Sequence, residues 1–262
     1  MIRHIVPEID ITEIDIRDSI KLVKNRISSA CLKYGRNEQE VKLLAVSKTK
    51  PLAMVEAAID CGQQDFGENY LQDAHEKILA LSLGKSSQGA SAPRSKHKND
   101  ISWHFIGAIQ SNKTKIIAEN FDWVHTVSSV KVARRLSDQR PKIFKPLNIL
   151  IQINIDAEIS KSGILPDQAE ELIESIHSME QIKLRGLMAI PAKDQKTDIN
   201  AYKRLRNLLG ELKQSFALEQ FDQLSMGMSG DLELAIAEGS TIVRVGTDIF
   251  GARATRSHEK LI

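Results

Sequence analysis

Cysteine is scarce in this sequence, since Cys31 and Cys61 are the only two and no CxxC pair occurs. Two such thiols supply neither the disulfide framework of a small secreted protein nor a cysteine-based zinc site. The seven histidines are scattered, without an HxxxH or HExxH pattern, so the sequence predicts no metal centre. A reducing compartment suits this composition best, and we expect a cytoplasmic protein.

An excess of charge and long hydrophobic runs are also lacking. The 36 Lys and Arg residues nearly balance the 34 Asp and Glu residues, which leaves a formal net charge of +2. Such a small charge argues against nucleic acid or an anionic membrane as a partner, because both are bound through a strong positive field. No apolar run approaches the roughly 20 residues that cross a bilayer. Acidic residues also occupy the N-terminal stretch where a signal peptide would be apolar.

The glycine motifs of nucleotide-binding proteins and hydrolases are incomplete or absent. Residues 84–86 read Gly-Lys-Ser, but Leu79 stands where a P-loop needs its first glycine, and no GxGxxG sequence occurs. Residues 227–230 do not complete a GxSxG nucleophile elbow, because Asp231 occupies the last position. The chemistry of these protein classes is therefore not expected here.

What is present is a regular alternation of strand-like and helical patterns. Short apolar runs typical of buried strands lie at residues 42–47, 65–67, 103–107, 123–127, 147–155, 183–190, 223–226 and 241–245. Eight strands separated by helices predict a parallel (β/α)8 TIM barrel, in which the carboxyl end of every strand reaches one face. A doubly wound open sheet is the alternative arrangement, although it normally uses fewer strands.

Two segments lie outside this alternation. Residues 12–35 carry apolar side chains at helical spacing up to Gly35, which predicts an extra N-terminal helix. Residues 82–99 are rich in serine and basic residues and contain no acid, which predicts a surface loop. No linker divides the chain, so we expect residues 1–262 to form a single domain.

Lys48 follows directly on the apolar stretch LLAVS, so its side chain is expected at the mouth of the barrel. An ordinary lysine has a pKa of about 10.4, and burial or a nearby cation lowers it. The resulting neutral amine can attack an aldehyde and form a Schiff base. Most lysines are solvated surface residues, so position alone leaves both interpretations open.

Small residues and hydroxyl groups gather after the last two predicted strands. Barrels commonly bind a phosphate there, through backbone N–H groups. Four residues suit such a site, although they also suit ordinary turns: Ser229, Gly230, Gly246 and Thr247. Arg244 is predicted to point into the barrel if its neighbours Val243 and Val245 face the helices. A buried arginine requires a hydrogen-bond acceptor.

Taken together in chain order, seven motifs resemble the pyridoxal phosphate homeostasis protein family, the single-domain relatives of the alanine racemase N-terminal barrel. The matches span nearly the whole chain, and they are specific only in combination. They are AVSKTKP (45–51), FGENYLQ (66–72), WHFIGAIQSNK (103–113), KSG (161–163), RGLMAIP (185–191), SMGMSGDLELAI (225–236) and VRVGTDIFGAR (243–253). The sequence departs from the family pattern at Leu232, where methionine is expected, and in the long 82–99 stretch.

The resemblance implies that Lys48 forms the internal aldimine with pyridoxal 5′-phosphate and that Arg244 faces the pyridine nitrogen. A cation there keeps the ring nitrogen unprotonated and weakens the cofactor as an electron sink. Lys161 of the KSG motif is a second lysine that could accept the cofactor during transfer.

The same resemblance implies the remaining contacts of the cofactor. Its phosphate would be bound by Ser229, Gly246 and Thr247, and its ring would be lined by Asn69 and Met226. These implied positions agree with a lysine after the first predicted strand and an anion site after the last two.

The sequence is compatible with three functions. The leading interpretation is a non-catalytic, monomeric carrier that takes part in vitamin B6 homeostasis and supplies pyridoxal 5′-phosphate, with apo-enzymes as possible recipients. The alternatives are a single-domain amino-acid racemase and a Schiff-base aldolase without a cofactor. The resemblance implies that a racemase needs a tyrosine from a further β domain, and the sequence ends shortly after the last motif. We expect the three tyrosines, Tyr34, Tyr70 and Tyr202, to serve packing, although Tyr70, which adjoins Asn69, is the one that could approach the mouth.

Overall fold

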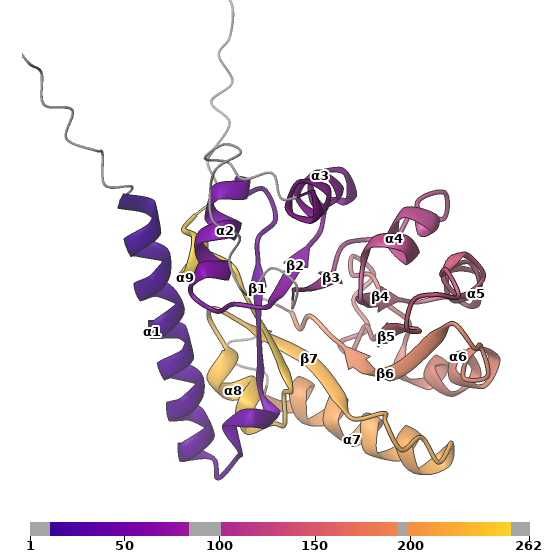
Figure 1. The fold of residues 1–262 in the computed structure, drawn as a ribbon. Coiled ribbons are helices and arrows are strands. Elements are labelled where there is room, and N and C mark those ends of the chain that lie inside the picture. Colours follow the sequence, from indigo (N-terminus) through magenta and orange to yellow (C-terminus); the bar gives the residue numbers. More distant parts are fainter. Residues whose placement is uncertain (1–10, 84–100, 193–198, 253–262) are drawn as a thin grey trace, which may run out of the picture.

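The computed structural model describes residues 11–83, 101–192 and 199–252, and its eight parallel strands close into a barrel in sequence order (Figure 1). This confirms the predicted TIM barrel over the open sheet. The strands are β1 (Lys42–Val46), β2 (Asp65–Glu68), β3 (Ser102–Phe105), β4 (Trp123–Val127), β5 (Leu147–Gln152), β6 (Ile182–Met188), β7 (Gln223–Met228) and β8 (Ile242–Val245). Each predicted strand segment overlaps one of them.

Helices surround the barrel, as expected for strands that are buried on both faces (Figure 1). They are α1 (Ile11–Lys33), α2 (Leu52–Asp60), α3 (Leu71–Ser82), α4 (Thr114–Asn120), α5 (Val130–Gln139), α6 (Ala169–Ile176), α7 (Ile199–Ser215), α8 (Leu232–Ala237) and α9 (Thr247–Phe250). Short 3-10 helices, η1 (Glu38–Glu40) and η3 (Pro166–Gln168), precede β1 and α6. The expected loop at 82–99 lies outside the described residues apart from its first two positions. None of the described helices has both the length and the hydropathy needed to cross a membrane.

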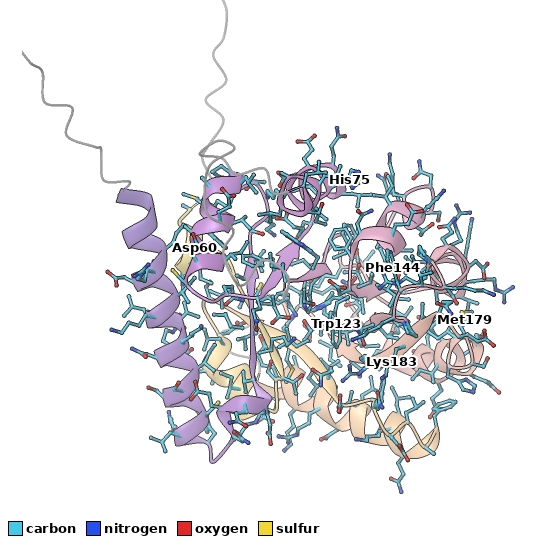
Figure 2. All side chains as sticks on the ribbon, viewed as in Figure 1. Asp60, His75, Trp123, Phe144, Met179 and Lys183 are labelled. Atoms are coloured by element: carbon cyan, nitrogen blue, oxygen red, sulfur yellow. The ribbon has the colours of Figure 1, made fainter. Side chains whose placement is uncertain are left out.

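The core has two layers because side chains of a strand alternate between its faces. Val243 and Val245 of β8 belong to the large cluster between strands and helices, as predicted. A smaller apolar cluster fills the inside of the barrel and consists of Leu44, Trp123, Leu150, Met188 and Ile242. Figure 2 shows Trp123 within the ring of strands. The remaining interior space is occupied by polar side chains.

The predicted N-terminal helix is present as α1, which lies along α2, α8 and α9 (Figure 1). One face of this helix is buried, through Ile16, Ile20, Val23, Ile27 and Cys31. Tyr34 follows the helix and remains 36% exposed beside Lys33, so its predicted packing role is wrong. The contact with α8 and α9 matters for the site, because both helices follow strands that border it.

Candidate functional site

A cavity of about 380 Å³ opens at the carboxyl end of the strands, where TIM barrels place their sites. Its volume is in the range of small-molecule sites. Strands β1, β6, β7 and β8 and the turns that follow β2 and β3 contribute to its lining. Six of the seven residues that the resemblance assigns to the cofactor line it, together with Gly230 of the predicted phosphate turn: Lys48, Asn69, Ser229, Arg244, Gly246 and Thr247. Residues that are more than 190 positions apart in the sequence therefore meet at one mouth, as the order of the strands predicts.

The turn that carries Lys48 is held on both sides by a buried network. Lys77 of α3 donates hydrogen bonds to the Ser47 carbonyl at 2.9 Å and to the Asp73 carboxylate at 2.9 Å. The same carboxylate accepts the backbone N–H of Thr49 at 3.1 Å. Thr49 has a φ of 64°, a conformation that costs energy for a β-branched residue and needs such support. The backbone on either side of Lys48 is thus fixed from α3.

Glu68, at the end of β2, completes this network in the protein interior. Its Oε1 accepts hydrogen bonds from Ser47 Oγ at 2.7 Å and from Lys77 Nζ at 2.8 Å. Burial raises the pKa of Glu68, and the ammonium of Lys77 opposes that shift. The buried pair orders the turn more than it stabilises the fold, since desolvation offsets much of its attraction.

Arg244 enters the barrel from β8 and is anchored by three hydrogen bonds. Its Nη1 donates to the Ser225 carbonyl at 2.6 Å and to Ser225 Oγ at 2.7 Å, and Nη2 donates to the Ala189 carbonyl at 3.0 Å. Burial lowers the pKa of Arg244 to about 10, so the guanidinium stays cationic at neutral pH. The prediction that it points inward is confirmed. The cavity therefore has a fixed positive charge at its inner wall.

Two turns, which follow β7 and β8, form the polar edge of the cavity. Ser229 and Gly230 precede α8, and Gly246 and Thr247 begin α9. The first N–H groups of a helix have no acceptor within the helix, so they remain available to an anion. A side chain at Gly246 would place its Cβ 3.2 Å from the Val46 carbonyl, which requires a small residue there.

Arg26 of α1 joins these two turns from outside the barrel. It donates hydrogen bonds to the Ser229 carbonyl at 2.9 Å, to Glu233 of α8 at 2.7 Å and to Asp248 of α9 at 2.6 Å. Arg26 is not among the residues predicted from the sequence. No local signal marks it, because its partners lie more than 200 positions away.

Asn69 presents an unpaired polar atom at the cavity. Its Oδ1 is buried and has no hydrogen-bond partner within the described part of the chain. A buried acceptor without a partner is costly, so this atom is suited to a donor on a ligand or on a neighbouring ammonium group. Gly107 allows the Asn69 backbone to approach this closely, because any side chain at position 107 would collide with the Asn69 carbonyl.

The structure does not place Met226, the seventh predicted residue, at the cavity. Met226 is fully buried in the layer between strands and helices, whereas Met228 lines the cavity. Ser225 points into the barrel, so regular alternation along β7 turns the next residue, Met226, outward. The pairing of β7 with β8 is irregular between Ser225 and Met228, with Gly227 at a φ of 88°, and beyond this irregularity Met228 faces the cavity.

Two further lysines lie at the mouth. Lys50 lines the cavity, donates to the Ala252 carbonyl at 2.8 Å and has its pKa lowered by burial. Lys161 does not line the cavity. Its ammonium donates to the carbonyl of Ile190 at 3.2 Å, and Ile190 does line it. Glu158 forms an ion pair with Lys161 at 3.5 Å.

The tyrosines have different surroundings. Tyr202 of α7 is buried, as predicted, and its hydroxyl donates to Asp231 at 2.7 Å. Burial and the Asp231 carboxylate raise the pKa of Tyr202 well above its ordinary value, so it remains a donor. Tyr70 is 51% exposed beside the start of α3, so its predicted packing role is wrong.

Comparison with known proteins agrees with this geometry. Residues 27–254 match the family model for the alanine racemase N-terminal domain. The chain is 46% identical over 241 residues to the pyridoxal phosphate homeostasis protein of Haemophilus influenzae, covering 91% of this chain and 96% of that protein. The corresponding protein of Escherichia coli is 44% identical over 245 residues, with coverages of 91% and 97%.

Solved structures of related proteins have the same fold as this chain. PipY of Synechococcus elongatus, solved with PLP bound, is 31% identical with a TM-score of 0.71, covering 87% of this chain and 100% of that chain. Alanine racemase from Corynebacterium glutamicum has a TM-score of 0.62 and covers 94% of this chain and 63% of that chain. Its 17% identity supports a shared fold alone. The chain therefore belongs to the alanine racemase N-terminal domain family and, within it, to the pyridoxal phosphate homeostasis proteins.

Proposed function

We propose that this protein binds pyridoxal 5′-phosphate in the cavity and holds it as a Schiff base on Lys48. In that reaction the lysine nitrogen adds to the aldehyde carbon, the carbon–nitrogen double bond forms, and the aldehyde oxygen leaves as water. The observation that carries the proposal is the meeting of Lys48, Arg244 and the two small-residue turns at one cavity. The relative PipY, whose structure was solved with PLP bound, supports it.

The residues present fit each chemical part of the cofactor. The turns at 229–230 and 246–247 offer hydroxyl and backbone donors to a phosphate. The guanidinium of Arg244 offers a donor to an unprotonated ring nitrogen. The buried Oδ1 of Asn69, which has no partner in the described residues, offers an acceptor to the ring hydroxyl or to the Lys48 amine. Apolar lining from Met188 and Met228 suits the ring faces.

The identity of the residue at the ring nitrogen favours a carrier over an enzyme. Pyridoxal phosphate supplies an electron sink when its ring nitrogen is protonated, and a permanent cation at that position opposes protonation. Arg244 is buried and anchored by three bonds, so it cannot move aside readily. The relatives from Haemophilus influenzae and Escherichia coli are called homeostasis proteins and not enzymes, which agrees with a non-catalytic role.

An amino-acid racemase remains the alternative, and one observation favours keeping it. A racemase needs a second base across the ring from Lys48, and Lys50 is another amine that lines the cavity. Among the described lining residues there is no tyrosine. Incubation of the loaded protein with L-alanine in deuterated water tests this alternative. We expect neither α-proton exchange nor D-alanine, and robust formation of both would establish an enzyme.

Supply of the cofactor to other proteins completes the proposal. Lys161 is a candidate acceptor during transfer, because its ammonium lies against the cavity residue Ile190. We propose apo-enzymes that use pyridoxal phosphate as recipients, and a single chain in the cytoplasm as the working form. The free thiols of Cys31 and Cys61 are consistent with that compartment.

The absorption spectrum of the purified protein tests the binding proposal. We expect a yellow protein whose visible band is retained through gel filtration. Lys48→Ala should lose the band while its far-ultraviolet circular dichroism is unchanged. Lys50→Ala is the matched control and should keep the band. A colourless parent protein that fails to take up added pyridoxal phosphate would refute the proposal and favour an aldolase without a cofactor.

A further inference from the structure

A continuous chain of hydrogen bonds runs through the inside of the barrel and ends on Arg244. Ser225 Oγ lies 2.7 Å from Arg244 Nη1 and 2.9 Å from His125 Nδ1. His125 Nε2 lies 2.9 Å from His104 Nδ1. His104 Nε2 lies 3.0 Å from Asp65 Oδ1. The members come from five different strands, β8, β7, β4, β3 and β2, and both histidines are fully buried.

The two end groups, Arg244 and Asp65, together with neutral imidazoles, determine which group donates in each hydrogen bond. Arginine can only donate, so Ser225 Oγ accepts from Arg244, and its own hydrogen is available to the lone pair of a neutral His125 at Nδ1. His125 then carries its proton on Nε2 and donates to His104 Nδ1. His104 in turn carries its proton on Nε2 and donates to Asp65, whose carboxylate can only accept. All five groups are satisfied in one proton order, with both imidazoles neutral.

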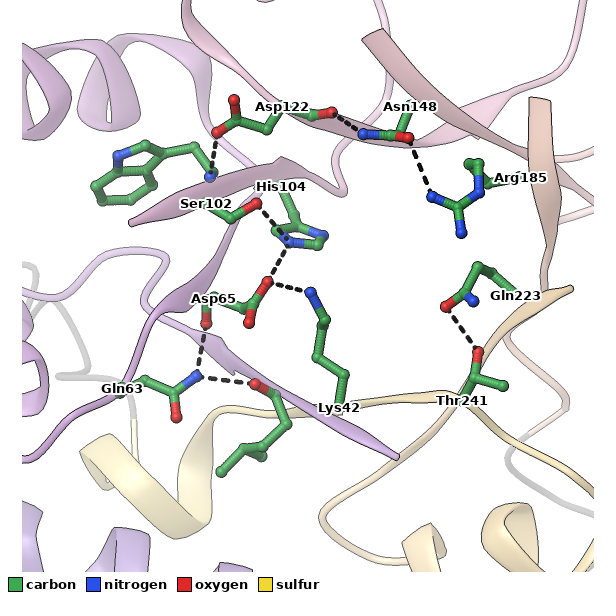
Figure 3. A network of polar contacts seen from close by, with 12 residues as sticks. Lys42, Gln63, Asp65, Ser102, His104, Asp122, Asn148, Arg185, Gln223 and Thr241 are labelled. Atoms are coloured by element: carbon green, nitrogen blue, oxygen red, sulfur yellow. Dashed lines mark hydrogen bonds and ion pairs between the residues drawn. The ribbon is translucent and has the colours of Figure 1, made fainter. Parts of the chain in front are cut away.

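The series of hydrogen bonds ends, on the side away from Arg244, at the opposite face of the barrel from the cavity. Asp65 and Lys42 are the first residues of β2 and β1, and Lys42 Nζ donates to Asp65 Oδ1 at 2.7 Å. Figure 3 shows Lys42, Asp65 and His104 directed toward one another, with Ser102 beside the histidine. Ser102 Oγ is 3.3 Å from His104 Nε2, so it forms a side branch and not a link of the chain.

The surroundings of the two imidazoles favour their neutral forms. His104 stacks on Trp123 at 5.4 Å and faces the charges of Asp65, Lys42 and, more weakly, Asp122. His125 faces the other imidazole and the cations Arg244 and Lys42. Burial lowers the pKa values of both histidines. The Asp65 carboxylate opposes that shift at His104, whereas the other imidazole and the cations add to it at His125, whose pKa is lowered most strongly. Neutral rings preserve the proton order at neutral pH.

We propose that Asp65, His104, His125 and Ser225 form a positioning relay that holds the guanidinium of Arg244 in one orientation at the cavity. The relay makes Ser225 Oγ an acceptor toward Arg244, because the hydroxyl hydrogen is already committed to His125. Its consequence for the cofactor rests on the proposed function: the ring nitrogen meets a donor whose direction is set from the far face of the barrel. These are positioning residues, since none of the four lines the cavity.

The first test uses the protein without added cofactor, after removal of any bound cofactor and without mutation. Nitrogen-15 NMR of the histidine rings distinguishes a protonated from an unprotonated nitrogen. We expect His104 and His125 both to be neutral at pH 7.5, with the proton on Nε2 and Nδ1 unprotonated. A proton on Nδ1 of either ring would overturn the relay, because Ser225 would then no longer be held as proposed.

The second test compares two serine variants of the barrel interior. Ser225→Ala removes the link between His125 and Arg244 but keeps the backbone carbonyl that also binds Arg244. Ser102→Ala removes only the side branch and is the matched control. In the cofactor-free protein, the Nη–H signals of Arg244 should be resolved in the parent and in Ser102→Ala. They should broaden through faster rotation in Ser225→Ala. Equal Arg244 signals in all three proteins would overturn the relay.

Cofactor binding to the same variants then measures the consequence. We expect the dissociation constant for pyridoxal phosphate to rise about tenfold in Ser225→Ala, together with a shift of its visible band. In Ser102→Ala both should stay within about twofold of the parent. An affinity and spectrum unchanged in Ser225→Ala would overturn the role toward the cofactor. Failure of the parent to bind would refute the proposed function separately, because the NMR results do not depend on binding.

Discussion

The guanidinium of Arg26 donates a hydrogen bond to the backbone carbonyl of Ser229 at 2.9 Å, which connects the N-terminal helix to the edge of the cavity. The same side chain binds carboxylates on α8 and α9. Helix α1 is thus more than an additional outer helix. It holds together the two turns that we propose bind the phosphate.

Arg26→Ala should therefore weaken retention of pyridoxal phosphate while the barrel remains folded. The ion pairs are about one third exposed, so their loss corresponds to ~1 kcal/mol or a threefold to fivefold rise in the dissociation constant. Fluorescence titration measures that constant. Arg17→Ala, an exposed arginine on the same helix, is the control and should bind like the parent. An equal loss in both variants would show that helix charge, and not the Ser229 contact, is responsible.

Removal of a hydroxyl from either turn tests the phosphate contacts directly. Ser229→Ala and Thr247→Val should each raise the dissociation constant about tenfold to hundredfold, since a hydrogen bond to a charged group contributes about 1.5–3 kcal/mol. Pyridoxal without its phosphate should bind the parent protein much more weakly and should not distinguish the variants. Equally tight binding of pyridoxal and its phosphate ester would contradict an anion site at these turns.

The buried histidines predict a loss of stability in mild acid. The folded state lowers the pKa values of His104 and His125, so below the unfolded value of 6.5 the unfolded chain binds more protons. Their contribution is complete above pH 6.5 and is lost as the pH falls toward their folded pKa values. Between pH 7.5 and 5.5 the free energy of unfolding should fall, by at most about 3 kcal/mol for two such groups.

Urea denaturation of the cofactor-free protein at several pH values measures this dependence. His125→Gln should show less than half the fall, because the pKa of His125 is lowered more strongly than that of His104. Substitution of the exposed His177 by glutamine is the control. A free energy of unfolding that is constant over this pH range would contradict the neutral, buried state of the pair.

Gly163 predicts a backbone requirement in the KSG segment. Its φ is 118°, and a Cβ would lie 2.8 Å from the backbone nitrogen of Asn154, so Gly163→Ala should cost about 1–3 kcal/mol. The change should also slow transfer of the cofactor if Lys161 takes part. Gly210→Ala, in α7 with open space around it, is the control and should stabilise by about 0.5–1 kcal/mol. Thermal unfolding of both variants measures these changes in stability. A Gly163→Ala protein as stable as the parent would contradict the backbone requirement.

The sequence predicts the barrel well because short runs rich in apolar residues alternate with helical segments, as in the segment 123–127, which coincides with β4 and is flanked by Asp122 and Ser128. It also places Lys48 and Arg244 correctly. Lys48 follows the end of a strand, and Arg244 alternates with two valines that face the helices. Both inferences depend only on local pattern and on the common direction of parallel strands.

Other parts of the site depend on information that no local pattern contains. Met228, and not Met226, lines the cavity beyond an irregularity in β7. The contact of Arg26 with Ser229 joins residues 203 positions apart. The bond between His104 and His125 requires the relative register of two strands, which periodicity does not supply. Position within the closed barrel, and not residue type, gives these groups their roles.

Borohydride reduction followed by mass spectrometry tests the Schiff base on Lys48 most directly. Reduction converts the carbon–nitrogen double bond to a stable single bond, so the modified lysine can be read from its peptide. We predict a phosphopyridoxyl adduct on Lys48 in the parent protein and no adduct in Lys48→Ala. An adduct on Lys50 or Lys161 with Lys48 unmodified would contradict the proposal that Lys48 holds the cofactor.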